Sequence, residues 1–304
     1  MAFVVHKFGK TVQKLIIRIF RRGMKTVGFQ ESFDSCGPYK SVCTFQDGDI
    51  SYIYTSADTK IGPSMKDGYN YSGESINAFF ELTERFYPTM EIQQEHGVFF
   101  DIGANIGTTS LYVKKQIGKS MRVIGFECGK TNYDIFRINC ILNDAEDIVA
   151  EYAGCSNVTR KARYRYVSDN PGGSHIVSNE DPNGMEDVTL TRLDDYCKSK
   201  GIHPNEINYI WIDVEGHEPE VLDGMRAILA IKKIPLFHEF SPKHYQTVGS
   251  LDMYCSVVSQ YYRNFIDVNE YISGTEKQRS VSEIEAFAQE MIDSGKNQTD
   301  LFLF

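Results

Sequence analysis

From residue 98 onward, short apolar segments alternate with segments of helical character, and this alternation constrains the fold more than any other feature. The segment "VFFDIG" at 98–103 is almost wholly apolar, as a strand must be when both faces of a parallel sheet are covered. Repeated strand–helix units pack into a doubly wound sheet. The sequence therefore predicts an α/β fold with a doubly wound, mostly parallel seven-stranded sheet. Its strands are expected at 98–103, 122–127, 148–155, 207–216, 234–240, 264–271 and 300–304, and its helices at 106–118, 131–143 (Thr131 as N-cap), 218–229 and 280–294.

The residues before this pattern differ in character. Residues 1–30 contain seven Lys and Arg and no Asp or Glu, and their apolar residues follow helical spacing. This pattern predicts a basic amphipathic helix, which either packs on the domain or contacts an anionic membrane surface through residues 1–25. Residues 31–96 are predicted to form an N-terminal cap on the substrate side. Within that cap we expect short strands in 40–72 and a helix in 72–87.

Composition excludes several classes of protein. The chain has no run of eighteen apolar residues, which a membrane-spanning helix would need. Its seven cysteines form no CxxC pair, a pattern typical of free thiols in a reducing compartment. A cytoplasmic protein is therefore expected. If the basic helix binds lipid, the protein would be peripheral at the inner face of the membrane. Outside residues 1–30 there are 25 basic and 41 acidic side chains, a net charge of −16. Such a body repels phosphate backbones, so no nucleic-acid partner is expected.

The stretch "FFDIGANIG" carries the main clue to a cofactor. A dinucleotide fingerprint reads GxGxxG, but Asn105 stands where its second glycine would lie, so the pattern is an acid followed by GxxxG. An acid at a strand end suits an ammonium group better than a pyrophosphate, and S-adenosylmethionine has an ammonium group and no phosphate. Glu127 ends the next strand and can accept hydrogen bonds from ribose hydroxyls. The predicted cofactor is S-adenosylmethionine, and the predicted cofactor-binding residues are Asp101, Gly103, Ala104, Asn105, Gly107 and Glu127.

These motifs, together with "GFE" at 125–127, "INCILN" at 138–143, "TRLDDYC" at 191–197, "WIDVEGHEPEVLDG" at 211–224 and "HEF" at 238–240, resemble those of the FkbM-type methyltransferases. The resemblance covers roughly residues 70–304. It implies a class I, Rossmann-like fold in which residues 97–304 form the S-adenosylmethionine-binding domain and the last strand is antiparallel. It also implies O-methylation of a glycan or small metabolite. Two positions depart from the family pattern: Cys128 stands in place of a common proline, and Trp211 in place of a common lysine.

Candidate catalytic residues follow the fourth and fifth predicted strands, because ligands of open α/β sheets bind outside the carboxyl ends of the strands. Asp213 is the leading candidate to lie near the methyl group or the acceptor. His217 is the leading candidate for general base, because the pKa of histidine lies near neutrality. Glu239, which the resemblance favours, and Glu215 are the alternatives. A Mg²⁺ site built from Asp194, Asp195 and Asp213 is not favoured, because no ligand spacing requires it, and Asp194 is expected to cap a helix instead.

These observations predict an S-adenosylmethionine-dependent O-methyltransferase whose partner is a small-molecule or glycan acceptor. Oxygen is favoured as the methyl acceptor because no [DN]PP[FY] tetrapeptide follows the fourth strand. A non-catalytic protein that keeps the fold, and a nicotinamide-dependent oxidoreductase, are the alternatives. Two segments are expected to set specificity: 40–72 and 167–187. The tyrosines of the first either stack on a sugar or form a small core: Tyr52, Tyr54, Tyr69 and Tyr71. The second is a long loop that acts as a lid or is disordered.

Overall fold

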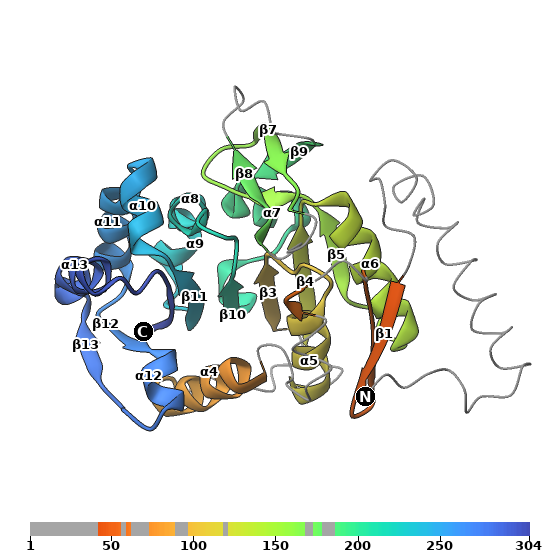
Figure 1. Cartoon of the computed structure of the whole chain (residues 1–304), viewed down its shortest axis with the longest axis horizontal. Coiled ribbons are helices and arrows are strands. Elements are labelled where there is room, and N and C mark those ends of the chain that lie inside the picture. The colour runs from red at the N-terminus through yellow and green to blue at the C-terminus, as the bar shows by residue number, and fades with distance from the viewer. Residues whose placement is uncertain are drawn as a thin grey trace, which may run out of the picture.

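The computed structural model describes residues 42–55, 59–61, 73–88, 97–117, 121–167, 173–177 and 186–304. Its centre is one large sheet with the strand order β13-β12-β14-β11-β10-β3-β4-β5 (Figure 1). The strands are β3 (Val98–Ile102), β4 (Arg122–Glu127), β5 (Val149–Tyr152), β10 (Ile207–Ile212), β11 (Leu236–Phe240), β12 (Asn264–Asp267), β13 (Gln278–Ser280) and β14 (Thr299–Leu303).

The sheet confirms the predicted fold class. Strands β5, β4, β3, β10 and β11 pair in parallel, and β14 runs antiparallel to both of its neighbours, β11 and β12. All seven predicted strands are present. The eighth, β13, is a three-residue edge strand with the sequence QRS, which lacks the apolar alternation that would have predicted it.

Helices cover both faces of the sheet, which explains why β3, β10 and β11 are buried along their whole length. One core cluster lies beneath α7 (Leu193–Lys200), α8 (Glu218–Asp223), α9 (Arg226–Ile231), α10 (Pro242–Val248), α11 (Leu251–Tyr261) and α13 (Ile284–Ser294). The other lies beneath α4 (Gly73–Phe86), α5 (Thr108–Ile117), α6 (Lys130–Leu142) and α12 (Val268–Ile272).

Several predicted boundaries were wrong. The helix predicted at 218–229 is two helices, because the Asp194 carboxylate accepts hydrogen bonds from the amides of Ala227 and Ile228 and starts α9 there. Asp194 therefore caps α9 and not α7, the helix in which it lies. The strand predicted at 264–271 ends at Asp267, whose side chain caps α12. Helix α6 starts at Lys130 after Gly129, so Thr131 is not its N-cap.

A small second sheet lies at the top of Figure 1, with the order β6-β9-β7-β8. It consists of β6 (Gly154–Cys155), β7 (Arg160–Arg165), β8 (His175–Val177) and β9 (Glu186–Thr191). The segment 167–187 was predicted to be a loop throughout. Instead, His175–Val177 pairs with β7, and Glu186 and Asp187 begin β9, so this part of the prediction is corrected.

The hairpin of β1 (Val42–Asp47) and β2 (Ile50–Thr55) packs beside α6 (Figure 1). Two side chains of α6 bind its backbone: Asn139 binds the amide and carbonyl of Ile53, and Asn143 binds those of Ser51. Tyr52 and Tyr54 are buried in the core, so they do not form a sugar-stacking surface, while Tyr69 and Tyr71 lie outside the described residues. The helix predicted in 72–87 is confirmed as α4, and its Phe79 packs against Trp211 and Phe237 of the sheet.

The basic helix predicted in residues 1–30 lies outside the described residues, so it and its membrane contact stay predictions, as do the domain boundaries. Within the described part of the chain, no helix is long and apolar enough to cross a bilayer.

Candidate active site

The glycine turn after β3 has the tight geometry that its sequence requires. Gly103 and Gly107 have φ angles of 92° and 85°, and Asn105 between them is also left-handed, with a φ of 51°. The amides of Gly103 and Ala104 both donate to the carbonyl of Phe126 on β4. A Cβ on Gly103 would lie 1.8 Å from the carbonyl oxygen of Asp213, so the turn packs directly on the chain that leaves β10.

Glu127 joins this turn to the start of α6. Its two carboxylate oxygens accept hydrogen bonds from the amide of Asn105, at 2.9 Å, and from the amide of Gly129, at 2.6 Å. Burial raises the pKa of Glu127 to about 7, although both hydrogen bonds act against the rise. Each oxygen keeps a second lone pair, which can accept a hydrogen bond from a ligand hydroxyl.

A pocket opens beside the turn, between the ends of β3, β4 and β10 and the small sheet, which contributes Tyr164, His175 and Ile176 to its wall. Among the described residues that line this pocket there is no Lys or Arg, so a pyrophosphate would find no cationic partner. The wall offers hydrogen-bond acceptors instead: Glu127, Asp213 and the Oδ1 atom of Asn105, which is buried without a partner. The pocket therefore suits a ligand rich in hydroxyl and amino donors.

Both positions that depart from the family pattern contribute to this wall. Cys128 follows Glu127, and Trp211 stacks on Phe237 with ring centroids 3.5 Å apart. Trp211 is only 3% exposed and belongs to the core, so it shapes the pocket from behind.

The structure places Asp101 behind the turn and not in the described pocket wall. Its side chain is 1% exposed and accepts a hydrogen bond from the Ser110 hydroxyl at 2.5 Å. Burial, with a smaller contribution from the charge of Asp213, raises its pKa to about 7. Contact between Asp101 and an ammonium group of the cofactor stays a prediction. The position of Asp101 behind the turn does not favour it.

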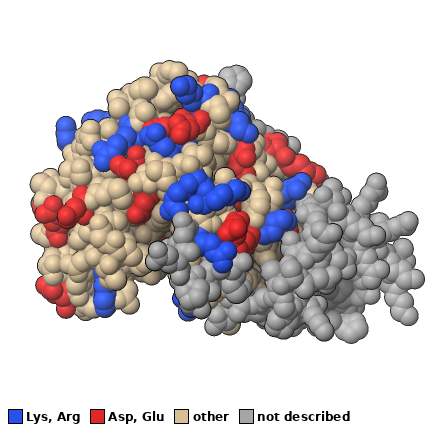
Figure 2. Space-filling model, turned by 90° about the horizontal axis from the view of Figure 1, so that it is seen from above, with Lys and Arg blue, Asp and Glu red and all other residues tan. Residues whose placement is uncertain are grey.

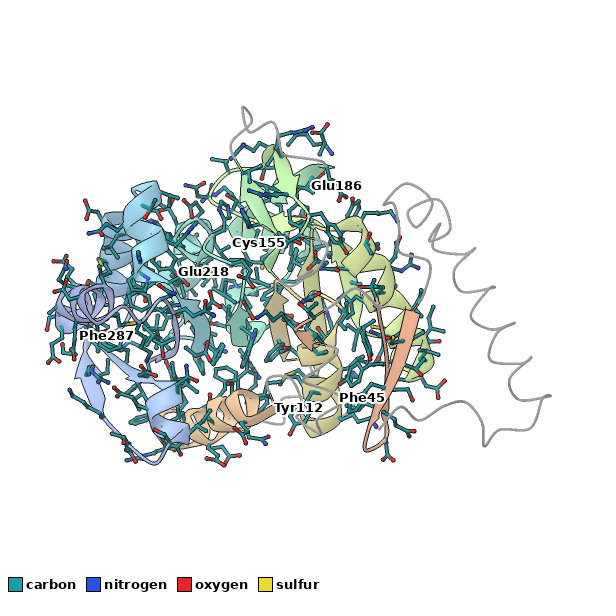
Figure 3. The ribbon with its side chains drawn as sticks, viewed as in Figure 1. Phe45, Tyr112, Cys155, Glu186, Glu218 and Phe287 are labelled. Carbon is teal, nitrogen blue, oxygen red and sulfur yellow. The ribbon has the colours of Figure 1, made fainter. Side chains whose placement is uncertain are left out.

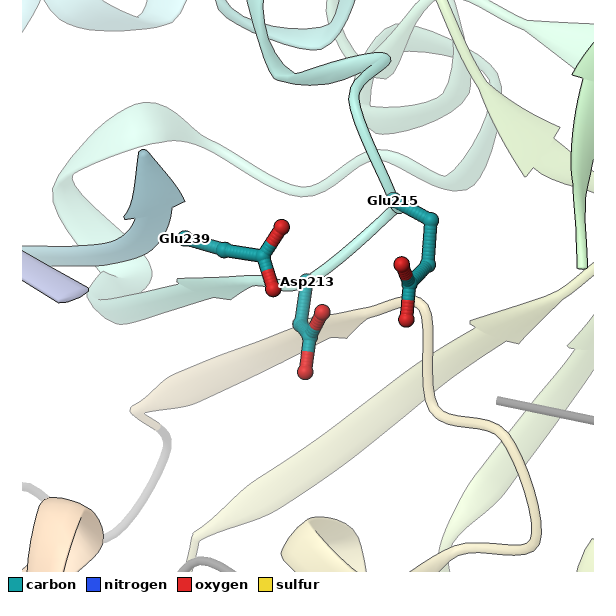
Figure 4. Close-up of side chains that lie close together, drawn as sticks. All are labelled: Asp213, Glu215 and Glu239. Carbon is teal, nitrogen blue, oxygen red and sulfur yellow. The ribbon is translucent and has the colours of Figure 1, made fainter. Parts of the chain in front are cut away.

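Three predicted catalytic acids converge in the structure. Asp213 follows β10, Glu215 lies in the loop after it with a φ of 55°, and Glu239 lies on β11 (Figure 4). One carboxylate oxygen from each lies within 4.8 Å of the others. Figure 4 shows the three side chains directed into one shared space. Parallel strands with adjacent carboxyl ends explain why residues 26 positions apart meet here.

Burial raises the pKa of each of these three carboxyls, and mutual repulsion adds to the rise for Glu215 and Glu239. The pKa of Asp213 rises least, to about 6, while that of Glu215 rises to about 8 and that of Glu239 to about 10. The three carboxyls therefore titrate as one coupled group that resists carrying all of its charges at neutral pH, and Asp213 is the member whose pKa stays nearest its ordinary value.

His217 also lines the pocket, but both of its ring nitrogens face protein groups. Nε2 lies 3.0 Å from the Ser156 hydroxyl, and Nδ1 lies 3.5 Å from a carboxylate oxygen of Glu220. Burial, together with the charges of Arg160 and His244, lowers its pKa to about 4. This arrangement does not favour His217 as the general base, because its nitrogens are engaged and its basicity is low.

Glu218 is a residue whose role the sequence reasoning missed. It lies inside the molecule (Figure 3), where its carboxylate accepts hydrogen bonds from the amides of Val214 and Gly216 and from the Tyr245 hydroxyl. These bonds fix the loop that carries Asp213 and Glu215. A glutamate in the first turn of a helix was the only signal in the sequence, and it is not specific.

The fold and this site together define a class of protein: a doubly wound α/β domain with a pocket rich in hydrogen-bond acceptors at the carboxyl ends of its strands, beside a group of carboxyls. The comparison with known families gives the family itself. The model of the methyltransferase FkbM domain matches residues 101–280. Because this match spans more than half of the chain, the protein belongs to the FkbM methyltransferase family.

Individual relatives are more distant. The curated Methyltransferase sdnD of Sordaria araneosa is 30% identical over 155 residues, and the match covers 41% of this chain and 59% of that relative. Methyltransferase FkbM from Methylobacillus flagellatus KT is 17% identical, with a TM-score of 0.37 over 69% of this chain and 44% of that one. TYW2 of P. horikoshii, solved in complex with MeSAdo, is 14% identical, with a TM-score of 0.38 over 86% of this chain and 71% of that one. At these TM-scores neither structure adds to the family assignment.

Proposed function

We propose that this protein is an S-adenosylmethionine-dependent methyltransferase whose acceptor is a hydroxyl oxygen of a sugar or small metabolite. The observation that carries the proposal is the convergence of Asp213, Glu215 and Glu239 at the edge of a pocket rich in hydrogen-bond acceptors. The pocket suits the cofactor, and the carboxyls suit the removal of a hydroxyl proton.

The residues of the first pocket fit S-adenosylmethionine. Glu127 would hold the ribose hydroxyls, because each of its oxygens has one lone pair free after binding a backbone amide. The unpartnered Oδ1 of Asn105 would accept a hydrogen bond from an amino group of the cofactor. When bound, the cofactor supplies a methyl group on a sulfonium that already makes a good leaving group.

The chain's own contribution is alignment of the acceptor and removal of its proton. Alignment of two reactants can supply about 7–11 kcal/mol of the barrier. Among the three carboxyls Asp213 keeps the pKa nearest its ordinary value, so we assign it the proton of the acceptor hydroxyl. Glu215 and Glu239 lie beside it and would orient the acceptor through hydrogen bonds. A well-placed base contributes about 10²–10⁴-fold to the rate.

A nicotinamide-dependent oxidoreductase is the weaker alternative, because Asn105 stands where the dinucleotide fingerprint needs its second glycine for the backbone to approach a pyrophosphate. A non-catalytic protein of the same fold is the other alternative. That protein would have no need for a base in the cluster, so the two proposals differ in what a change at Asp213 should do.

The test is transfer of a labelled methyl group from S-adenosylmethionine to a panel of sugars and small hydroxylated metabolites. With an acceptor in hand, Asp213→Asn should lower the rate about 10²–10⁴-fold while the affinity for S-adenosylhomocysteine changes little. Ser156→Ala is the matched control, because it alters only a neighbour of His217 and should leave the rate within a few-fold. Full activity of the Asp213 variant, or an equal loss in both variants, would contradict the assignment of Asp213 as the base.

A further inference from the structure

A second pocket lies next to the acidic cluster, on the side away from the glycine turn. It shares Glu215 with the first pocket, and its wall includes Glu239, Ser241, Lys243, His244 and Gln298. These residues come from the end of β11, from α10 and from the turn before β14. Two of the three clustered carboxyls line it, and one of them also lines the first pocket, so a molecule in this pocket would contact the cluster that borders the first pocket.

The described wall of the second pocket is polar throughout and contains no aromatic or aliphatic side chain of appreciable size. Two of its side chains bind Glu239: the Ser241 hydroxyl donates to one carboxylate oxygen at 2.9 Å, and the Gln298 amide donates to the other at 3.0 Å. Hydroxyl, amide and carboxyl groups at such spacing suit a ligand with several hydroxyls, since each can both donate and accept hydrogen bonds.

The same pocket also carries positive charge. Lys243 and His244 are exposed in its wall, and neither side chain makes a hydrogen bond or ion pair to a described residue. Burial and the charge of His175 lower the pKa of His244, so Lys243 supplies the charge. Arg160, an exposed residue of β7, lies close enough to His217 for its charge to lower the pKa of that histidine. Seen from above, the molecule has several Lys and Arg near its middle, with Asp and Glu close beside them (Figure 2). A protein with a net charge of −9 thus has cations at the mouth of its site.

We propose that the second pocket binds the methyl acceptor, and that this acceptor is a polyhydroxylated molecule with an anionic group that Lys243 contacts. The inference rests on the proposed function and narrows its substrate class. The acceptor would then be recognised by α10 and the turn at 297–298, and not by the tyrosines of β2, which are buried.

Glucuronate and glucose are the probes, because they share the ring and hydroxyls and differ in one carboxylate. Binding of each is measured by ligand-observed NMR to the full chain saturated with S-adenosylhomocysteine. Glucuronate should bind more tightly than glucose. Lys243→Ala should weaken glucuronate binding about tenfold, the lower end for one charge-assisted hydrogen bond, with little effect on glucose. Lys233→Ala, at another exposed lysine, should change neither.

Three results would overturn the inference: no binding of glucuronate, equal binding of both sugars, or an equal effect of both lysine variants. Calorimetric titration with S-adenosylhomocysteine separates this failure from failure of the proposed function. Retained binding of S-adenosylhomocysteine without glucuronate binding refutes the acceptor class alone. Loss of both would refute the cofactor assignment as well. Because Lys243 is exposed, the wild type and Lys243→Ala should unfold at the same temperature, and a thermal melt checks this.

Discussion

The close approach between the glycine turn and the chain after β10 makes a quantitative prediction for Gly103→Ala. The new Cβ would lie 1.8 Å from the carbonyl oxygen of Asp213, in a backbone with a φ of 92°. A left-handed backbone costs a residue with a Cβ about 1–2 kcal/mol. Overpacking in a closed site costs about 1–3 kcal/mol more. The free energy of unfolding should therefore fall by about 2–5 kcal/mol in the variant.

Gly274→Ala separates the two contributions. Gly274 has a φ of 88°, nearly that of Gly103, but nothing lies within 4 Å of the Cβ it would gain. In Gly274→Ala the free energy of unfolding should fall only by the cost of the left-handed backbone, about 1–2 kcal/mol. Urea unfolding of the two variants and the wild type measures both losses. Gly103→Ala should also weaken binding of S-adenosylhomocysteine, because it distorts the glycine turn that forms part of the pocket wall, whereas Gly274→Ala should not. Equal losses of stability in the two variants would refute the argument that close packing at Asp213 requires this glycine.

Two further predictions concern the buried carboxyls. Burial raises the pKa of Asp101 from 3.8 to about 7, so the stability this carboxyl contributes is present below about pH 4 and is lost as the pH rises through 7. Between pH 4 and pH 8 this carboxyl should lower the free energy of unfolding of the wild type by up to about 4 kcal/mol, and Asp101→Asn should not show that decrease. Urea unfolding across this pH range measures both proteins, and parallel pH profiles would contradict the prediction. Because the Asp194 carboxylate binds two amides of α9 and is not free to join Asp213 in a metal site, EDTA should leave methyl transfer unchanged, and loss of activity restored by Mg²⁺ would show instead that the cluster binds a metal.

The strands of the large sheet could be predicted because burial on both faces leaves a continuous apolar signal. "VFFDIG" and "RVIGFE" became β3 and β4 with nearly the predicted limits. The small sheet gave no such signal. His175–Val177 is half-buried and lies between segments rich in Gly, Pro and Asn, so its pairing with β7 is decided by tertiary contacts.

At the site, too, the positions of residues along the strands could be predicted, whereas their side-chain contacts could not. The sequence located Asp213, Glu215 and Glu239 at strand ends, and topology alone brought those ends together. It could not show that Asp101 turns inward to Ser110, or that Nε2 of His217 lies 3.0 Å from the Ser156 hydroxyl. Those facts depend on side chains 9 and 61 positions away in the chain. General pKa values favoured histidine as the base, whereas burial in the structure moves Asp213 toward neutrality and His217 away from it.

The central claim is that the pocket beside Glu127 binds S-adenosylmethionine. Calorimetric titration of the wild type and of Glu127→Gln with S-adenosylhomocysteine, with NAD⁺ as a second ligand, tests it most directly. The account predicts that the wild type binds S-adenosylhomocysteine and not NAD⁺. It also predicts that the variant, in which one buried amide loses its acceptor and the ribose loses a charged partner, binds at least about tenfold more weakly. A folded wild type that binds NAD⁺ as tightly as S-adenosylhomocysteine, or that binds neither, would contradict the account.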